Sequence, residues 1–236
     1  MQLFYTTDVQ LPQLVLHEEE ARHCTQVLRK RLGDTINVVD GRGNLYETVL
    51  AKADKKTCTL SVVQTQPNYA ARPYTLHIAC APTKNIERFE WFLEKATEIG
   101  IDAILPMVCQ CSERRQIRPD RLEKILVTAM KQSLKAALPT LAPVQSFAQI
   151  IADSHTFAGQ KMIAHCADDA HKQPLKTAYT AGENVLLLIG PEGDFAPEEV
   201  ALARQHGFVA VSLGTARLRT ETAAIVACHT ISLCNA

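Results

Sequence analysis

Two short segments near the C-terminus combine residue types that could bind a small ligand. In Leu188–Phe195, two glycines flank a Pro-Glu pair directly after an apolar run, and in Ser212–Ala223 a glycine precedes two arginines. Glycine lets the backbone approach a ligand closely, and proline stiffens a turn. Each segment alone is more often an ordinary strand-to-helix connection than a site. Their occurrence as a pair, which we expect on adjacent strands, favours a ligand pocket.

Several other kinds of chemistry have no matching pattern. The sequence contains no phosphate-binding loop of the Gly-x-x-x-x-Gly-Lys type, no nucleophile elbow and no His-Glu-x-x-His zinc motif. Gly41-Arg-Gly43 lacks the third glycine of a dinucleotide-binding turn. The close cysteine pair, Cys109 and Cys111, has no second pair at ligand spacing, so we expect reduced, packed cysteines and no metal.

Composition places the chain among globular proteins. It has 236 residues, of which 47% are hydrophobic and 21% charged, and its formal net charge is zero. No apolar run reaches membrane-spanning length, and the first thirty or so residues do not resemble a signal peptide. We therefore expect a cytoplasmic protein with no membrane partner. Basic residues concentrate between Arg114 and Lys135, which suits either a solvated helix or a nucleic-acid contact.

The first part of the chain is predicted to be strand-rich. Residues 17–29 have helical spacing of apolar positions, including Ala21, Cys24 and Val27, whereas the period then changes to that of short strands. The turn at 40–44 contains two glycines, as expected for a hairpin. Prolines interrupt both periods over 64–73. We interpret 1–68 as a small β-barrel followed by a hinge.

From residue 74 to 236, strands and helices alternate, which predicts an α/β domain with a mostly parallel sheet. Asn85 is a good N-cap and Gly100 a good terminator for a helix between them. The remaining elements are expected to be strands at 75–80, 103–108, 161–165, 184–189 and 208–213, and helices at 119–134, 197–206 and 220–234.

Three strings carry a resemblance to a known family. Ile189–Gly193, Leu213–Ala223 and His23–Arg29 resemble the 16S rRNA (uracil-N3)-methyltransferase family, and the similarity extends over essentially the whole chain. The resemblance implies a PUA-like RNA-binding β-barrel at 1–68. It also implies an α/β SPOUT (α/β-knot) methyltransferase domain with a C-terminal trefoil knot at 74–236.

The same resemblance implies an activity, a cofactor and partners. The activity would be methylation of N3 of one uridine, uridine 1498 in the usual bacterial numbering, in the 16S rRNA of the small ribosomal subunit. The methyl donor would be S-adenosylmethionine, and the enzyme would be a homodimer formed through its SPOUT domain. Asp194 departs from the family pattern, because many relatives have a third glycine there, and Ala196 stands where a capping serine is frequent.

Site residues follow from matching the motifs. The resemblance places the following residues at the S-adenosylmethionine pocket: His165, Ile189, Gly190, Pro191, Gly193, Leu213, Gly214, Arg217 and Leu218. Of these, His165 is in general more often a hydrogen-bonded core histidine.

The two catalytic candidates are Arg219 and Glu192. The Arg219 guanidinium would stabilise the uracil anion as N3 loses its proton, with a phosphate clamp or a partner of Glu221 as alternative roles. Glu192 would act as general base if it were buried, and is equally well explained as an acceptor for loop amides.

RNA phosphates would be contacted by basic residues in both parts of the chain: Arg29, Lys30, Arg31, Arg114, Arg115, Arg118 and Lys131. Trp91 invites a stacking role, although a single tryptophan on a helix is core more often than platform.

Two other classes of function remain open. One is a methyltransferase without a knot, but Ala81–Lys84 lacks the glycine-rich loop that such a fold wants after its first strand. The other is a non-enzymatic RNA-binding module for ribosome assembly, which the pair of glycine-containing turns argues against.

Overall fold

The computed structural model describes all residues, 1–236, and the chain forms two compact units. Unit 1 comprises Met1–Ala71 and Val127–Leu138, and unit 2 comprises Arg72–Leu126 and Pro139–Ala236. A single cut in the sequence does not separate these units, which the sequence did not predict. Helix α3 (Pro119–Gln132) begins in unit 2, and its last residues belong to unit 1.

Residues 127–138 belong to unit 1 because their apolar side chains are buried there. Met130 and Ala136 pack in one cluster with Leu3, Val39 and Leu45. The backbone also joins the barrel strands, since the amide of Gly43 donates to the Ala136 carbonyl at 3.0 Å. Burial of a methionine side chain of this kind stabilises by about 1.5–3 kcal/mol.

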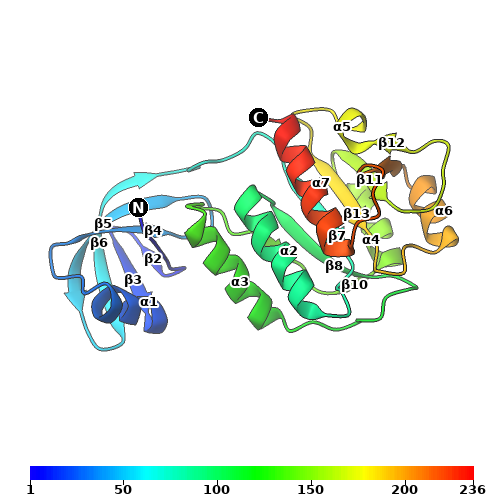
Figure 1. Cartoon of the computed structure of the whole chain (residues 1–236). Coiled ribbons are helices and arrows are strands. Elements are labelled where there is room, and N and C mark those ends of the chain that lie inside the picture. The colour runs from blue at the N-terminus through cyan, green and yellow to red at the C-terminus, as the bar shows by residue number, and fades with distance from the viewer. The chain divides into compact units, whose positions relative to one another are not determined.

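The N-terminal part of unit 1, Met1–Ala71, forms a six-stranded sheet with a helical segment, coloured blue to cyan in Figure 1. The strand order is β1-β4-β5-β6-β3-β2, with β1 and β4 parallel and the other pairs antiparallel. Thr6 connects strands from opposite sides of the sheet. Its amide donates to the carbonyl of Val39 in β4 at 3.1 Å, and its hydroxyl donates to the carbonyl of Val15 in β3 at 2.5 Å. The strand and helix bounds are β1 (Leu3–Tyr5), β2 (Val9–Gln10), β3 (Gln13–His17), α1 (Glu18–Arg22), β4 (Thr35–Val39), β5 (Leu45–Ala53) and β6 (Thr57–Gln66).

The hairpin turn at 40–44 forms where the glycines predicted it. Gly41 and Gly43 have φ of 76° and 93°, a backbone region that residues other than glycine rarely adopt. The Asp40 carboxylate accepts hydrogen bonds from the amides of Arg42 and Asn44 and so fixes the turn.

The helix predicted over 17–29 is shorter and changes its pitch. After α1 the chain makes a π-helical turn over His23–Val27, closed by a hydrogen bond from the Leu28 amide to the His23 carbonyl. A π turn widens the helix and shifts the side chains that follow it around the axis. Val27, predicted to face the core, is therefore 62% exposed, whereas Ala21 and Cys24 are buried as expected.

Unit 2 is built on one parallel sheet with strand order β10-β8-β7-β13-β11-β14-β12, and β9 pairs with β8. Its central strand β13 is buried at every residue, as its continuous apolar run predicted. The strand bounds are β7 (Leu76–Cys80), β8 (Ala103–Val108), β9 (Thr140–Leu141), β10 (Gln145–Ser146), β11 (Gln160–Ala164), β12 (Gln173–Pro174), β13 (Val185–Ile189) and β14 (Val209–Ser212).

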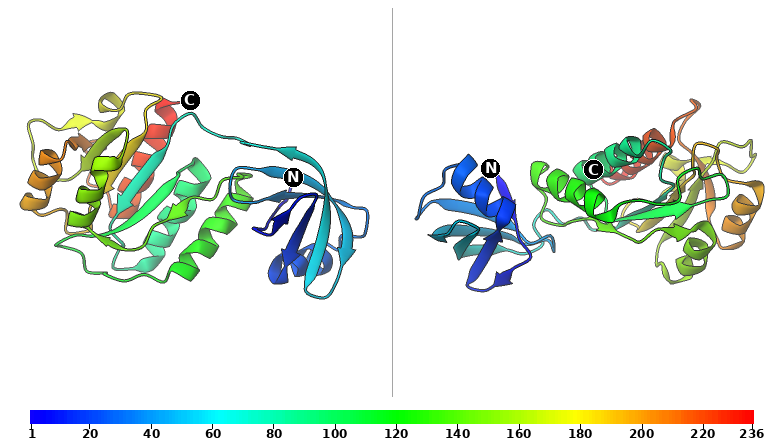
Figure 2. Two further views of the ribbon diagram at one scale, coloured as in Figure 1. Left: turned by 180° about the vertical axis from the view of Figure 1, so that it is seen from behind. Right: turned by 90° about the horizontal axis from the view of Figure 1, so that it is seen from below.

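Helices cover both faces of this sheet, as the two views in Figure 2 show. Side chains of α4 and α6 share one buried cluster with alternate residues of β13, while α2 and α7 pack together on the opposite face. Asn85 caps α2 by accepting a hydrogen bond from the Glu87 amide, and Gly100 ends it at φ 128°, both as predicted. The helix bounds are α2 (Ile86–Ile99), α4 (Phe147–Asp153), α5 (Leu175–Ala178), α6 (Pro197–Gln205) and α7 (Thr220–Cys234).

The single tryptophan of the chain lies on helix α2 of unit 2. Trp91 on α2 is 45% exposed, so the expectation that it lies in the core is wrong. Its neighbours Phe89, Phe92 and Leu93 fill the buried side of the helix instead.

No helix of the chain combines the length and the apolar character that crossing a membrane requires.

Candidate functional site

Three strands of unit 2 end side by side at one edge of the sheet. β11, β13 and β14 are parallel, and the turns that follow them begin at His165, Gly190 and Leu213. The sequence suggested that the two glycine-containing turns follow adjacent strands, but β11 lies between β13 and β14. The turn after β11 is therefore the middle wall of the site. Ligands of open parallel sheets bind at such carboxyl ends.

The three turns enclose two adjoining cavities. The larger, of about 510 Å³, lies between the turns after β11 and β14, and the smaller, of about 290 Å³, lies between the turns after β13 and β14. Both volumes fall within or close to the range typical of small-molecule sites. The wall common to the two cavities consists of Ala164, Cys166, Asp194, Arg217, Leu218 and Ala223. The cavities are thus two halves of one cleft, which we call the cleft of unit 2.

Close packing inside the protein explains the glycines of the turn after β13. A Cβ on Gly190 would lie 3.0 Å from the Phe195 ring, and one on Gly193 would lie 3.0 Å from Cys111 Cβ. From the sequence we expected these glycines to make room for a ligand. The fold requires them instead because the protein's own side chains leave no space for a Cβ. Neither has a positive φ, whereas Asp194, which follows them, has φ 63°.

Most of the predicted cofactor residues line the cleft. His165, Leu213 and Gly214 lie on the larger cavity and Ile189, Gly190 and Pro191 on the smaller. Arg217 and Leu218 belong to the common wall. Gly193 lines neither cavity, because its open side faces Cys111.

His165 is a buried side chain without a hydrogen-bond partner. Its side chain is 2% exposed, neither ring nitrogen has a partner, and Nε2 lies 3.5 Å from Oδ2 of Asp169, which pairs with Arg204. Burial lowers the pKa of His165, as do the charges of Lys172 and Arg204, against the opposing effect of Asp194. The ring is therefore neutral near pH 7. The ring is buried as expected of a core histidine, but neither nitrogen forms the hydrogen bond that such a residue usually has.

The lowered pKa of His165 predicts a pH dependence of stability. As the pH falls through 6.5, the unfolded chain binds a proton that the folded chain resists, so the free energy of unfolding decreases below that pH. His165→Gln removes this contribution. We expect the wild type to lose more stability than the variant between pH 8 and pH 5, measured by urea unfolding.

The exposed His155 provides the matched control for this measurement. His155→Gln should leave the wild-type pH dependence in place. His77, whose pKa burial also lowers, adds a contribution of the same sign to every variant. Equal pH dependence in wild type and His165→Gln would contradict the assignment.

The two catalytic candidates differ in their surroundings. Arg219 is the N-cap residue of α7 and lines the smaller cavity with its exposed side chain, and no group of the protein pairs with its guanidinium. Glu192 lines the same cavity, but it is exposed and its Oε1 accepts a hydrogen bond from the Lys84 amide at 2.9 Å. Glu192 was expected to act as a base only if it were buried, and it is not buried. Glu192 has instead the arrangement of the alternative role, an acceptor for loop amides.

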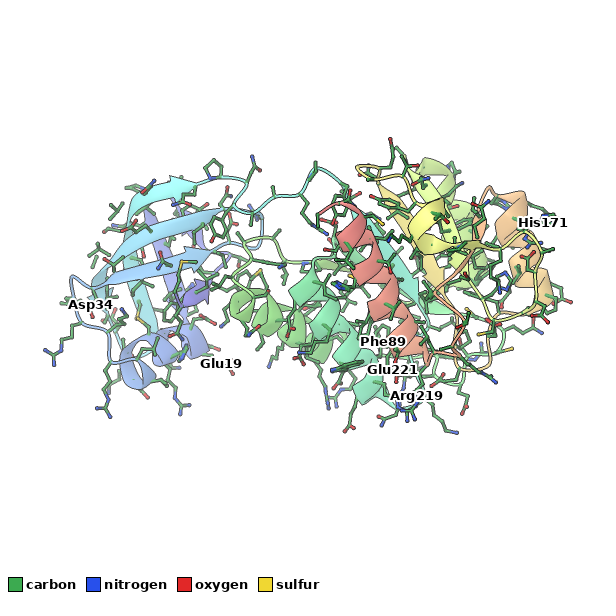
Figure 3. All side chains as sticks on the ribbon, turned by 45° about the horizontal axis from the view of Figure 1, so that its top comes forward. Glu19, Asp34, Phe89, His171, Arg219 and Glu221 are labelled. Carbon is green, nitrogen blue, oxygen red and sulfur yellow. The ribbon has the colours of Figure 1, made fainter.

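Glu221 does not pair with Arg219, although both lie at the start of α7 (Figure 3). Its side chain is 6% exposed, its nearest cation is Arg88 Nε at 3.9 Å, and its Oε2 has no partner. The alternative in which Arg219 serves as the partner of Glu221 is therefore not what the structure has.

The basic residues predicted to contact RNA fall into two groups. Arg115 and Arg118 are exposed and make no bond within the chain through their guanidinium groups. Arg114 donates to the carbonyls of Thr83 and Lys84, at 2.9 and 2.7 Å for the shortest bond to each. These bonds tie the segment after β8 to the loop before α2.

In unit 1, Lys131 pairs with Glu20, and Lys30 donates to the Thr35 carbonyl at 3.2 Å. The guanidinium groups of Arg29 and Arg31 have no such partner. The sequence placed Lys131 on the catalytic domain, whereas its contacts belong to unit 1.

Several lining residues were missed by sequence reasoning. Cys166, Ala167 and Lys172 come from the turn after β11, and Asp194 reaches both cavities. Lys172 holds this turn by donating to the carbonyls of His165 and Ala167. The predicted strand at 161–165 was the available signal, but its position between β13 and β14 could not be read from local spacing.

Comparison with known proteins gives matches over most of the chain. The model of the RNA methyltransferase domain matches residues 70–232, and the model of the RNA methyltransferase PUA domain matches residues 16–63. Ribosomal RNA small subunit methyltransferase E of Synechocystis is 30% identical over 223 residues, which cover 91% of this chain and 71% of the relative. The protein of the same name from Mycobacterium tuberculosis is also 30% identical and is covered to 83%.

Solved structures give the same result. A probable rRNA-methyltransferase from Porphyromonas gingivalis is 43% identical, with a TM-score of 0.89 and 99% of each chain covered. A putative methyltransferase from Legionella pneumophila, solved with bound SAM, is 27% identical with a TM-score of 0.85, covering 99% of this chain and 97% of that one.

Proposed function

The chain belongs to the RNA methyltransferase family that includes the ribosomal RNA small subunit methyltransferases E, and we propose that it methylates N3 of one uridine in 16S rRNA, uridine 1498 in the usual bacterial numbering. S-adenosylmethionine is the methyl donor. The observation that carries the proposal is the cleft of unit 2, because the turns that carry the family motifs line it together.

The residues of the cleft suit this donor. Ile189, Leu213 and Leu218 offer apolar surface for an adenine ring, and the buried His165 borders the larger cavity. The family relative from Legionella pneumophila, solved with SAM, supports the same assignment.

The bound donor supplies an electrophilic methyl group, and the protein's own residues must orient the base and stabilise its charge. Arg219 carries out the second task in this proposal. Its guanidinium is exposed and unpaired at the smaller cavity, so it is free to interact with the uracil as N3 loses its proton. Glu192 anchors the turn after β13 to the loop before α2 through its bond to the Lys84 amide.

RNA recognition is assigned to phosphate contacts from both units. Unit 1 contains the region that matches the PUA domain model and carries the basic loop Arg29–Arg31. In unit 2 the contacts come from Arg115 and Arg118, which are free of bonds within the chain, whereas Arg114 serves to hold the loop. Such contacts fix the position of the RNA without reading its sequence.

The double variant Arg115→Ala/Arg118→Ala tests this surface. We expect it to weaken binding of 16S rRNA and to reduce the slope of log K against log salt by about 2, since each lost phosphate contact removes about one unit. Fluorescence titrations at several salt concentrations would measure both. Lys176→Ala, which removes a cation from α5, is the control. An unchanged slope in the double variant would show that Arg115 and Arg118 do not contact RNA phosphates.

Finer features of the fold belong to the same proposal. The α/β unit is a SPOUT domain in which the C-terminal segment forms a trefoil knot, and it assembles as a homodimer.

One experiment separates this function from RNA binding without catalysis. The protein is incubated with labelled S-adenosylmethionine and small ribosomal subunits from cells that lack the activity, or with 16S rRNA stripped of protein. We expect one methyl group per RNA, mapped to N3 of a single uridine in at least one of the two substrates. RNA binding without methyl transfer to either would favour an assembly factor instead.

A further inference from the structure

The wall common to the two cavities carries one carboxylate, that of Asp194, and we propose that this residue makes the cleft prefer the positively charged methyl donor over the neutral product. The inference builds on the proposed function and adds a residue that selects between the two ligands. S-adenosylmethionine carries one positive charge, on its sulfonium, that S-adenosylhomocysteine lacks.

The backbone of Asp194 holds the residue firmly at the junction. Its amide donates to the Pro191 carbonyl at 2.9 Å, which closes the turn after β13, and its φ of 63° lies in the left-handed region. Asparagine and aspartate tolerate this region better than other residues with a side chain. The carboxylate is therefore aimed by a closed turn rather than by a mobile loop.

One carboxylate oxygen joins two walls of the cleft. Oδ2 of Asp194 accepts a hydrogen bond from the Cys166 amide at 2.8 Å, so the turn after β13 is clamped to the turn after β11. Any weakening of this clamp should affect every ligand of the cleft alike. The clamp and the charge are thus separate contributions of the same side chain.

The position of the charge accounts for selection. Asp194 lines both cavities, whereas the only other lining carboxylate, Glu192, belongs to the smaller one and is bonded to the Lys84 amide. Arg217, on the common wall, has the charge that suits the donor's own carboxylate. Donor and product share that carboxylate, so its attraction to Arg217 is common to both ligands, whereas the attraction of Asp194 to the sulfonium is present for the donor alone.

Calorimetry with both ligands tests the proposal. Asp194→Asn keeps the left-handed turn and an oxygen for the Cys166 amide, but removes the charge. We expect the ratio of the product Kd to the donor Kd to fall about 3- to 10-fold, the size of one ion interaction across a few ångströms of partly solvated cleft. The change should shrink at high salt.

Two further variants isolate the clamp and the location. Asp194→Gly removes both contributions, so it should show the same altered ratio together with weaker binding of both ligands. Asp168→Asn neutralises an exposed carboxylate of the turn after β11 that lines neither cavity, and should leave the ratio unchanged.

The outcomes are distinguishable from a failure of the proposed function. If the wild type binds both ligands and Asp194→Asn retains the wild-type ratio, the selection by Asp194 is wrong and the methyltransferase proposal stands. If the wild type binds neither ligand, both proposals are overturned. Thermal unfolding of each variant shows whether a loss of binding reflects a loss of folded protein.

Discussion

Replacing Arg219 with alanine is expected to lower kcat for methylation of the small subunit by about 100- to 1000-fold, the effect of removing one preorganised group from a site where charge develops. The guanidinium lines the smaller cavity, is exposed and has no partner in the protein. Its removal therefore leaves no buried charge unpaired. The loss should appear in kcat, since the interaction strengthens only as N3 becomes anionic.

Donor affinity and the conservative variant make this test specific. Calorimetry should give nearly the same Kd for S-adenosylmethionine in Arg219→Ala as in the wild type, because the loss is confined to the transition state. Arg219→Lys, which keeps the charge but not the planar fork, should recover part of the rate. A rise in KM for RNA with kcat unchanged would instead identify Arg219 as a phosphate clamp.

The substitution Gly159→Ala is expected to destabilise unit 2 by about 1–3 kcal/mol, the usual range for an overpacked site. A Cβ at this position would lie 2.4 Å from the backbone carbonyl oxygen of Asn184. A backbone atom cannot move aside as a side-chain tip can. The clash also falls beside the Gln160 amide, which donates to that same carbonyl where β11 and β13 begin their pairing.

Thermal unfolding measures this effect directly. If the destabilisation is close to about 3 kcal/mol, we expect the Tm of unit 2 to fall by roughly 5–10 °C. Ala158→Ser, a small change at the exposed neighbouring residue, should alter stability by no more than about 0.5 kcal/mol. A Gly159→Ala variant as stable as Ala158→Ser would mean that the start of β11 shifts freely, and the register of the central strands would need revision.

Local sequence signals were sufficient for individual elements. Asn85 and Gly100 marked the two ends of α2 correctly because capping and termination depend on the residues at the helix ends alone. The apolar run of β13 and the glycines of the 40–44 turn likewise predicted what forms there.

Spatial relations between elements could not be predicted in the same way. The order of strands in a parallel sheet depends on packing between distant segments, so the sequence missed that β11 separates β13 from β14. For the same reason it missed the turn after β11, with Cys166 and Lys172, as a wall of the cleft. Burial of Met130 with Leu3, which assigns residues 127–138 to unit 1, is equally non-local.

Residue type alone also misassigned some roles. The glycines of the turn after β13 indicated a close approach correctly, but the approaching groups are Phe195 and Cys111 of the protein itself. Glu192 has the chemistry of a base and the surroundings of a loop anchor. Asp194 stood out in the sequence only as a departure from the family pattern, and its contact with the Cys166 amide became visible in the fold.

A crystal structure of the protein with S-adenosylmethionine tests the central claim most directly. We predict that the donor occupies the cleft of unit 2, in contact with Ile189, Leu213 and Leu218. A donor bound elsewhere on the chain, with the three turns closed on one another, would contradict it.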